Sequence, residues 1–313
     1  MNNKPPVEDR VWAVVAHLSA LAMGMGILLP IVGWSESRRK SNYTSFQSLQ
    51  ALGYQSLGYT IWILTTLVVV VIVSIGSVAG IANITSAENL QTEIMTLVFA
   101  HMTLMFGLIG IYFALPVIAA IACALGKDFR YPIMGNRLAK YLGYDFSQPN
   151  EEETWLIEEH EDRWVASMGH FAVIIMLWGM LAPITAWITQ GKRSTFLNLQ
   201  SVQAFVFQAG TLLLYILSMV IYFGGAIFFI ISIGGMDAAN LDSSFGIAGL
   251  VVLFGSLLCV FGIVLLVPLL HIMGQWAGYR ILKGDDYRYP IVGRLVERWV
   301  NRKTRLPDEE IPA

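Results

Sequence analysis

The sequence predicts an all-α integral membrane protein made of two tandem parallel repeats. Of its 313 residues, 56% are hydrophobic and only 13% are charged, whereas about a quarter of a soluble domain is charged. Four stretches contain no Asp, Glu, Lys or Arg, namely residues 60–82, 94–125, 209–235 and 245–272. The first half of the chain also recurs in the second half. Together with a mean hydropathy of +0.61, these observations indicate duplicated membrane units.

The repeat is defined by residues that recur at a constant offset. Glu8-Asp9-Arg10 returns as Glu161-Asp162-Arg163, an offset of 153 positions. The same offset carries His17, Pro30, Trp34, Gln47, Gln50, Ala51 and Gln55 onto His170, Pro183, Trp187, Gln200, Gln203, Ala204 and Gln208. Residues 126–133 and 284–291 both end in Tyr-Pro-Ile, at an offset of 158, so the second unit carries an insertion. We divide the chain into unit 1 (residues 1–143), an acidic linker (144–160) and unit 2 (161–313).

The four uncharged stretches predict two transmembrane helices in each unit. Each reaches the roughly 20 apolar residues that a helix needs to cross the hydrocarbon core. A helix also satisfies its backbone N–H and C=O groups internally, as lipid requires. An outer-membrane barrel would instead alternate apolar and polar residues in segments of about ten. Residues 1–10 are polar and lack the pattern of a cleavable signal peptide.

The distribution of positive charge predicts the topology. All 20 Lys and Arg residues fall in five segments: the N-terminus, 38–40, 127–163, 192–193 and the tail from 280. The loops 83–93 and 235–244 carry acidic residues (Glu88, Glu93, Asp237 and Asp242) and no basic residue. The positive-inside rule therefore predicts a multi-pass protein of the bacterial inner membrane, with both termini cytoplasmic and the acidic loops outside.

Residues 11–34 and 164–189 begin and end on the same side in this topology, which leaves two interpretations. A straight span would give three crossings per unit and would invert unit 2. A re-entrant hairpin would give two crossings and parallel units related by an axis along the membrane normal. The charge pattern favours the hairpin, and we expect the two hairpins to meet at the axis. Candidate helix breakers lie in both stretches: Gly24, Gly26, Pro30, Gly179 and Pro183.

A glutamine-rich helix is expected to follow each hairpin, over residues 42–55 and 195–208. Its repeated glutamines are Gln47, Gln50 and Gln55, with Gln200, Gln203 and Gln208. Amides in membrane units can join helices by hydrogen bonds, so these residues are candidates for fastening the hairpin to the long helices. Alternatively, they line a path for a substrate. Gly76, Gly80, Gly224 and Gly225 would allow helices to approach closely.

A basic amphipathic helix is expected after each Tyr-Pro corner. In unit 2, Arg294, Arg298 and Arg302 share one face, while Ile291, Leu295 and Trp299 share another. Such a helix lies flat on the cytoplasmic leaflet and contacts anionic headgroups. The lipid bilayer is thus one expected partner, and a second membrane protein is another. Nothing in the sequence indicates a nucleic-acid partner.

Catalytic and metal-binding signals are weak. No carboxylate lies inside an uncharged stretch, although carboxylates are typical of ion-coupled transport, and no Walker phosphate loop is present. Cys123 and Cys259 lie in apolar surroundings, so we expect neither a metal site nor a disulfide. His17 and His170 could in principle ligate haem, but we expect each to bond a backbone carbonyl of the broken helix. The sequence therefore predicts no cofactor and no catalytic residue.

Unit 1 resembles a widespread bacterial family of small multi-pass proteins of unknown function. The resemblance rests on Trp12-Ala13, His17-Leu18-Ser19, Pro30 and Trp34, on Gln50-Ala51-Leu52, and on the closing Arg130-Tyr131-Pro132-Ile133. That family is grouped with relatives of a small helical Tic-type component of the chloroplast inner-envelope import translocon. This chain departs from it by fusing two units and by carrying Gln47 and Gln200 where many members have His. The resemblance implies protein transport or complex assembly.

Three classes of function remain open at this point. A non-enzymatic scaffold or assembly subunit of a larger membrane complex fits the missing carboxylates and the missing nucleotide site best. A translocon-like or permeation component is the alternative, based on the resemblance, the glutamines and the re-entrant stretches. A membrane enzyme is the least favoured class.

Overall fold

The computed structural model describes residues 4–81, 87–147, 154–234 and 244–304, and these contain helices and no strand. Unit 1 comprises α1 (Val7–Leu18), η1 (Ser19–Ile27), α2 (Leu28–Ser37), α3 (Asn42–Gly53), η2 (Tyr54–Gly58), α4 (Tyr59–Ile81), α5 (Ala87–Ala124) and α6 (Met134–Leu142). Unit 2 comprises α7 (Glu158–Phe171), η4 (Ala172–Met180), α8 (Leu181–Gln190), α9 (Thr195–Gly234), α10 (Ser244–Leu282) and α11 (Val292–Thr304). The predicted all-α class is confirmed.

The first helix of each unit is broken and folds back on itself. A straight helix over residues 7–37 would be about 46 Å long, which would separate Trp12 and Gly33 widely. Instead, a Cβ placed on Gly33 would lie 3.4 Å from the Trp12 ring. In unit 2, Gly169 meets Pro183 in the same way. The chain thus reverses within each stretch, and the straight interpretation is excluded.

The break lies at a methionine in both copies. Met23 has φ 51° and ψ −139°, and Met176 has φ 54° and ψ −126°, a region that non-glycine residues rarely adopt. Glycine is needed shortly afterwards, because a Cβ on Gly26 would lie 1.8 Å from the Ser19 carbonyl oxygen. We had expected Pro30 to contribute to the bend, but it does not. It lies in the first turn of α2, where a missing N–H is tolerated.

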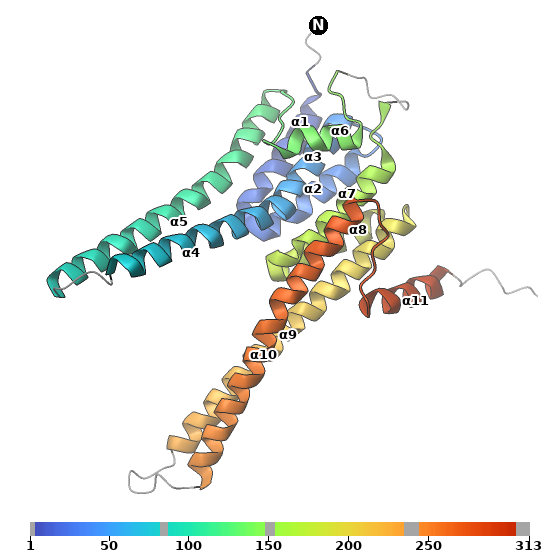
Figure 1. Ribbon diagram of the computed structural model, residues 1–313. Helices are drawn as coiled ribbons and strands as arrows, with labels where there is room; N and C mark the ends of the chain where they lie inside the picture. Colours follow the sequence, from blue (N-terminus) through green and yellow to red (C-terminus); the bar gives the residue numbers. More distant parts are fainter. Residues whose placement is uncertain (1–3, 82–86, 148–153, 235–243, 305–313) are drawn as a thin grey trace, which may run out of the picture.

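Two long helical hairpins extend from the body that the short helices form. The pairs α4–α5 and α9–α10 leave this body toward the same general side, so the repeats are parallel (Figure 1). Six helical segments among the described residues are long and apolar enough to cross a membrane, and these include both folded first stretches. Only 11% of the apolar window of α10 is buried inside the protein. The surroundings of these hairpins must therefore be apolar. Asp237 and Asp242, of the predicted acidic loops, lie outside the described residues.

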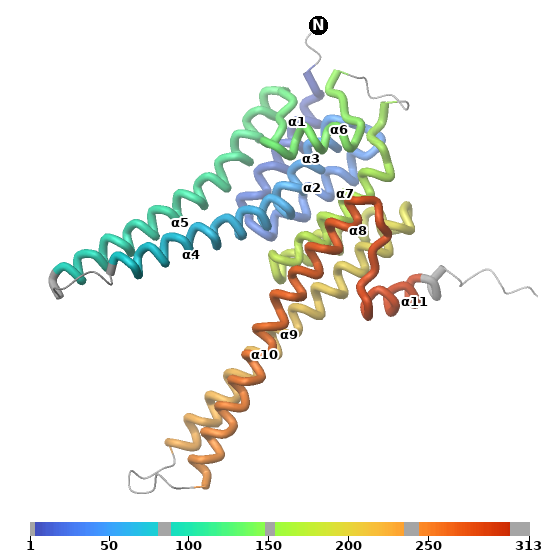
Figure 2. The backbone as a smooth tube through the Cα atoms, viewed as in Figure 1, coloured from blue at the N-terminus to red at the C-terminus, as the bar shows by residue number. Residues whose placement is uncertain are grey.

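The two units share one core. Helix α2 packs against α8, and η1 packs against η4, so the broken helices meet between the blue and the yellow-green segments of the tube in Figure 2. A Cβ on Gly24 would lie 2.6 Å from the Trp178 Cβ. One cluster of buried apolar side chains draws on both units, including Trp34, Phe46, Trp164 and Met168. The body is therefore a single packed structure.

The long hairpins differ between the units. In unit 2, α9 and α10 pack closely, with Gly225 against Ser256 and Gly249 against Ser232. In unit 1, a Cβ on Gly76 or Gly80 would meet nothing within 4 Å. The close approach that we expected at these glycines thus occurs at Gly225 and not on α4. The small residues of α4 remain on an exposed surface.

Candidate functional site

A buried polar network joins three segments of unit 1. His17 on α1 contacts the Tyr131 hydroxyl through Nδ1 and the Gln47 side-chain oxygen through Nε2, both at 3.0 Å. Gln47 donates in turn to Asp128 at 3.2 Å and to the Phe129 carbonyl at 3.1 Å. Since the Gln47 amide nitrogen is used in this way, its oxygen must accept from His17. The network therefore assigns a proton to Nε2 of His17.

Gln50 completes the network. It donates to Gln47 and to the Phe129 carbonyl, and its oxygen accepts from the backbone N–H of Tyr131 at 2.6 Å. The Tyr-Pro segment is thereby held against α3. Asp128 lies at the edge, where burial raises the pKa of its carboxyl group although the Arg130 guanidinium opposes that rise. Arg130 contacts Asp128 at 2.9 Å.

Unit 2 contains the same network at the repeated positions. His170 contacts the Tyr289 hydroxyl at 3.0 Å and Gln200 at 3.3 Å. Gln200 donates to Asp286 at 2.7 Å, and the oxygen of Gln203 accepts from the Tyr289 backbone N–H at 3.0 Å. His17, His170, Gln47, Gln50, Gln200 and Gln203 are all fully buried. Two copies of one arrangement show that it is a property of the repeated unit.

The third glutamine of each unit stabilises the break in the first helix. Gln55 donates to the Ala16 carbonyl at 3.3 Å and to the Ser19 hydroxyl at 2.9 Å. Gln208 donates to the Gly169 carbonyl at 2.7 Å. A helix that ends inside a core leaves carbonyl groups without partners, and these amides supply the missing donors.

Both ring nitrogens of His17 and His170 are engaged by protein side chains. We had expected a bond to a backbone carbonyl, and this detail is wrong, because a tyrosine hydroxyl and a glutamine oxygen occupy the two nitrogens instead. Neither ring has a free nitrogen for haem in this structure. Sequence reasoning did not identify Tyr131 and Tyr289 as the histidine partners, although both tyrosines belong to the repeat.

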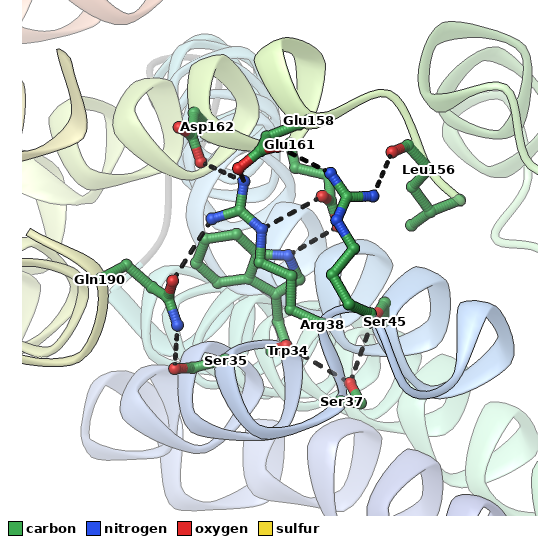
Figure 3. A network of polar contacts seen from close by, with 11 residues as sticks. Trp34, Ser35, Ser37, Arg38, Ser45, Leu156, Glu158, Glu161, Asp162 and Gln190 are labelled. Atoms are coloured by element: carbon green, nitrogen blue, oxygen red, sulfur yellow. Dashed lines mark hydrogen bonds and ion pairs between the residues drawn. The ribbon is translucent and has the colours of Figure 1, made fainter. Parts of the chain in front are cut away.

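A second polar site joins the two units. The Arg38 guanidinium, at the end of α2, contacts Glu158 at 3.1 Å, Glu161 at 3.4 Å and Asp162 at 2.9 Å on α7 (Figure 3). The Arg38 side chain is only 3% exposed. Trp34 donates its indole N–H to Glu161 at 2.9 Å. We call these five residues the inter-unit cluster.

Neighbouring groups extend this contact. Gln190, at the end of α8, accepts from Arg38 and donates to Ser35, so α8 is linked to α2 by side chains. Arg39 contacts Glu158 at 2.9 Å but is 36% exposed. Sequence reasoning used residues 38–40 only to orient the chain and 161–163 only to define the repeat. The inter-unit contact between them was missed.

The basic helix at the end of unit 2 is present as α11. Arg294 and Arg298 are exposed, and the apolar residues Ile291, Leu295 and Trp299 are exposed as well. The side chain of Arg302 lies outside the described residues. Helix α11 runs across the direction of the α9–α10 hairpin (Figure 1), an arrangement that suits a helix lying on a membrane surface.

The described residues contain no group of three or more His, Cys, Asp or Glu side chains that could hold a metal ion. Ser19 donates to the Ala16 carbonyl and Ser167 to the Gly278 carbonyl, so each hydroxyl stabilises helix packing. The polar groups of both sites contact one another across helices. Such an arrangement holds segments together.

A scan against protein-family models places these two units in a known family. The model described as the magnetosome magnetite crystal formation protein family (MamF_MmsF) matches residues 8–138 and again residues 161–296. The chain belongs to this family.

The two matches coincide with unit 1 and unit 2, so the family unit occurs twice in one chain. The six long apolar helical segments of the described residues agree with a multi-pass membrane protein. The expected relation to the import translocon finds no support in the family match. No curated protein and no solved structure matches the chain.

Proposed function

We propose that this chain is a non-enzymatic scaffold of the magnetosome membrane that acts in magnetite crystal formation by holding a membrane assembly together. Membership of the magnetosome family supports the setting and the process. The observation that supports a structural role is the use of the buried polar groups. In the His–Gln–Tyr network and in the inter-unit cluster, the donors and acceptors form hydrogen bonds and ion pairs between helices.

The surface of the chain supports a role in assembly. The long hairpins carry many exposed apolar side chains that must face lipid or other membrane helices, among them Ile72, Ile75, Phe99 and Phe106. The basic residues support an orientation with the body, α6 and α11 on the cytoplasmic face and the tips of the hairpins on the opposite side. A body on one face and helices that extend across the bilayer can connect partners on both sides.

Complementation in the native host tests this proposal. A strain that lacks the chain should form magnetite crystals of altered size or number, and the wild-type chain should restore them. Arg38→Glu should fail to restore them, because it places a fourth negative charge in the inter-unit cluster. Lys40→Glu is the matched control, since the Lys40 side chain is 71% exposed. Crystal dimensions are measured by electron microscopy.

Two results would refute the proposal. Normal crystals in the deletion strain would remove the role in crystal formation. Ion flux through liposomes that contain only the purified chain would favour a permeation component over a scaffold. Recovery of a stable membrane partner with the wild-type chain in mild detergent, and its loss with Arg38→Glu, would support the scaffold.

A further inference from the structure

A cavity of about 640 Å³ lies beside the base of the α4–α5 hairpin. This volume falls in the range of 300–1,000 Å³ that is typical of small-molecule sites. Its walls are aromatic and aliphatic, with Tyr54, Trp62 and Tyr112 on one side and Trp164 on the other. Trp164 and Leu282 belong to unit 2, so both units contribute to the lining.

Three polar groups of the apolar walls have hydrogen-bond partners within the protein. Tyr54 donates to the Tyr112 carbonyl at 2.6 Å, and Trp62 donates to the Leu108 carbonyl at 3.2 Å. Trp164 donates to the Leu49 carbonyl at 2.9 Å. These groups therefore present apolar ring faces to the cavity, which suits hydrocarbon.

The end of the cavity at α6 is different. The exposed Arg137 side chain lines it and makes no ion pair or hydrogen bond with the described residues. Tyr141 lines it as well, but its hydroxyl oxygen is buried and not accessible from the cavity. The positive charge of Arg137 at this end is complementary to an anion.

The position of the cavity identifies the kind of molecule. Its apolar part includes Ile61 and Ile111, which are 57% and 64% exposed on the helices predicted to cross the bilayer. Its polar end lies on α6, the amphipathic helix that is expected at the cytoplasmic surface. The geometry points to one anionic phospholipid per chain, bound with its phosphate at Arg137 and an acyl chain along Trp62 and Ile111.

Unit 2 lacks the groups that such a lipid needs. At the repeated positions, Arg137 is replaced by Leu295, Tyr141 by Trp299 and Tyr112 by Leu270. Leu270 packs against the core cluster of Phe207 and Tyr289. The site is thus specific to unit 1, and we expect a stoichiometry of one lipid. This inference is independent of the proposed role in crystal formation.

Native mass spectrometry of the full chain in mild detergent tests the site. The chain is stripped of lipid and titrated with phosphatidylglycerol, with zwitterionic phosphatidylethanolamine, or with inorganic phosphate. We expect one phosphatidylglycerol to bind per chain, more tightly than phosphatidylethanolamine. Arg137→Ala should weaken its binding about fivefold, as expected for one basic residue at a membrane surface. Lys140→Ala, on the same helix but outside the cavity, should change it less than twofold.

A second pair of variants tests the apolar wall. Ile111→Trp places a larger ring in the cavity and should abolish retention of the lipid. Ile118→Trp, two turns along α5 and also exposed, should leave it unchanged. Equal effects of Arg137→Ala and Lys140→Ala, or equal binding of the two lipids, would overturn the inference. Displacement of the lipid by inorganic phosphate would also overturn it. So would binding of a second copy of the chain in place of the lipid.

Discussion

Replacing Arg38 by methionine should destabilise the protein more than any other single change in charge at the surface between the units. Methionine keeps the length of the side chain but removes the guanidinium that Glu158, Glu161 and Asp162 share. The side chains of Glu161 and Asp162 are 2% and 9% exposed. Both carboxylates would remain buried without a positive partner.

The magnitude follows from this burial. Removing one partner of a buried ion pair costs about 3–5 kcal/mol, because the remaining charge stays desolvated. Glu158 adds little to this value, since its side chain is 60% exposed and solvent weakens the interaction. We therefore expect the free energy of unfolding to fall by about 3–5 kcal/mol. Neutralising the remaining carboxylates should recover part of the loss.

Equilibrium unfolding in mixed detergent micelles measures this difference. Trp34 and Trp164 lie at the junction of the units, so their fluorescence reports on its opening. Arg39→Met is the matched control, and it should cost less than about 1 kcal/mol because its ion pair is exposed. The double variant Arg38→Met/Glu161→Gln should be more stable than Arg38→Met alone. A loss below about 1 kcal/mol for Arg38→Met would refute the reasoning.

Three further outcomes are expected from the same unfolding measurement. Gln47→Leu removes the acceptor of His17 and a donor to Asp128, and should cost about 1–3 kcal/mol for each buried group left unpaired; a cost near zero would contradict the network. Gly26→Ala should destabilise strongly, because its Cβ would lie 1.8 Å from a carbonyl oxygen, whereas Gly76→Ala, in open space, should be neutral or stabilising. Burial raises the pKa of Asp128 above 3.8. As pH falls, the folded state therefore binds this proton before the unfolded state does. The contribution of Asp128 to stability should thus increase as pH falls from its raised pKa toward 3.8. Asp128→Asn should remove that slope, and an unchanged pH profile would count against the shift.

The broken first helix could be predicted, but the place of the break could not. The distribution of Lys and Arg favours a return of each stretch to the side where it began, and this distribution is a property of the sequence. Met23 is not a helix breaker, however, although it adopts a positive φ next to the expected breaker Gly24. No local propensity identifies the methionine as the strained position.

The polar network was only partly visible in the sequence. Gln47 and Gln50 could be recognised as structural candidates because they recur in unit 2. Their partners could not be recognised, since Tyr131 lies 114 positions from His17 along the chain. Helical periodicity relates only residues within one helix. The repeat held a usable signal, because His17, Gln47 and Tyr131 all recur together. Residues that recur together are candidates for mutual contact.

The positions at which the two units differ are equally informative. Arg38 has glycine, Gly191, at its repeated position, and Arg137 has Leu295. If a residue only stabilised its own unit, both copies would require it. A charged residue present in one copy alone is a candidate for a contact that exists once per chain. Arg38 does so at the junction of the units, and the same reasoning supports a single ligand at Arg137.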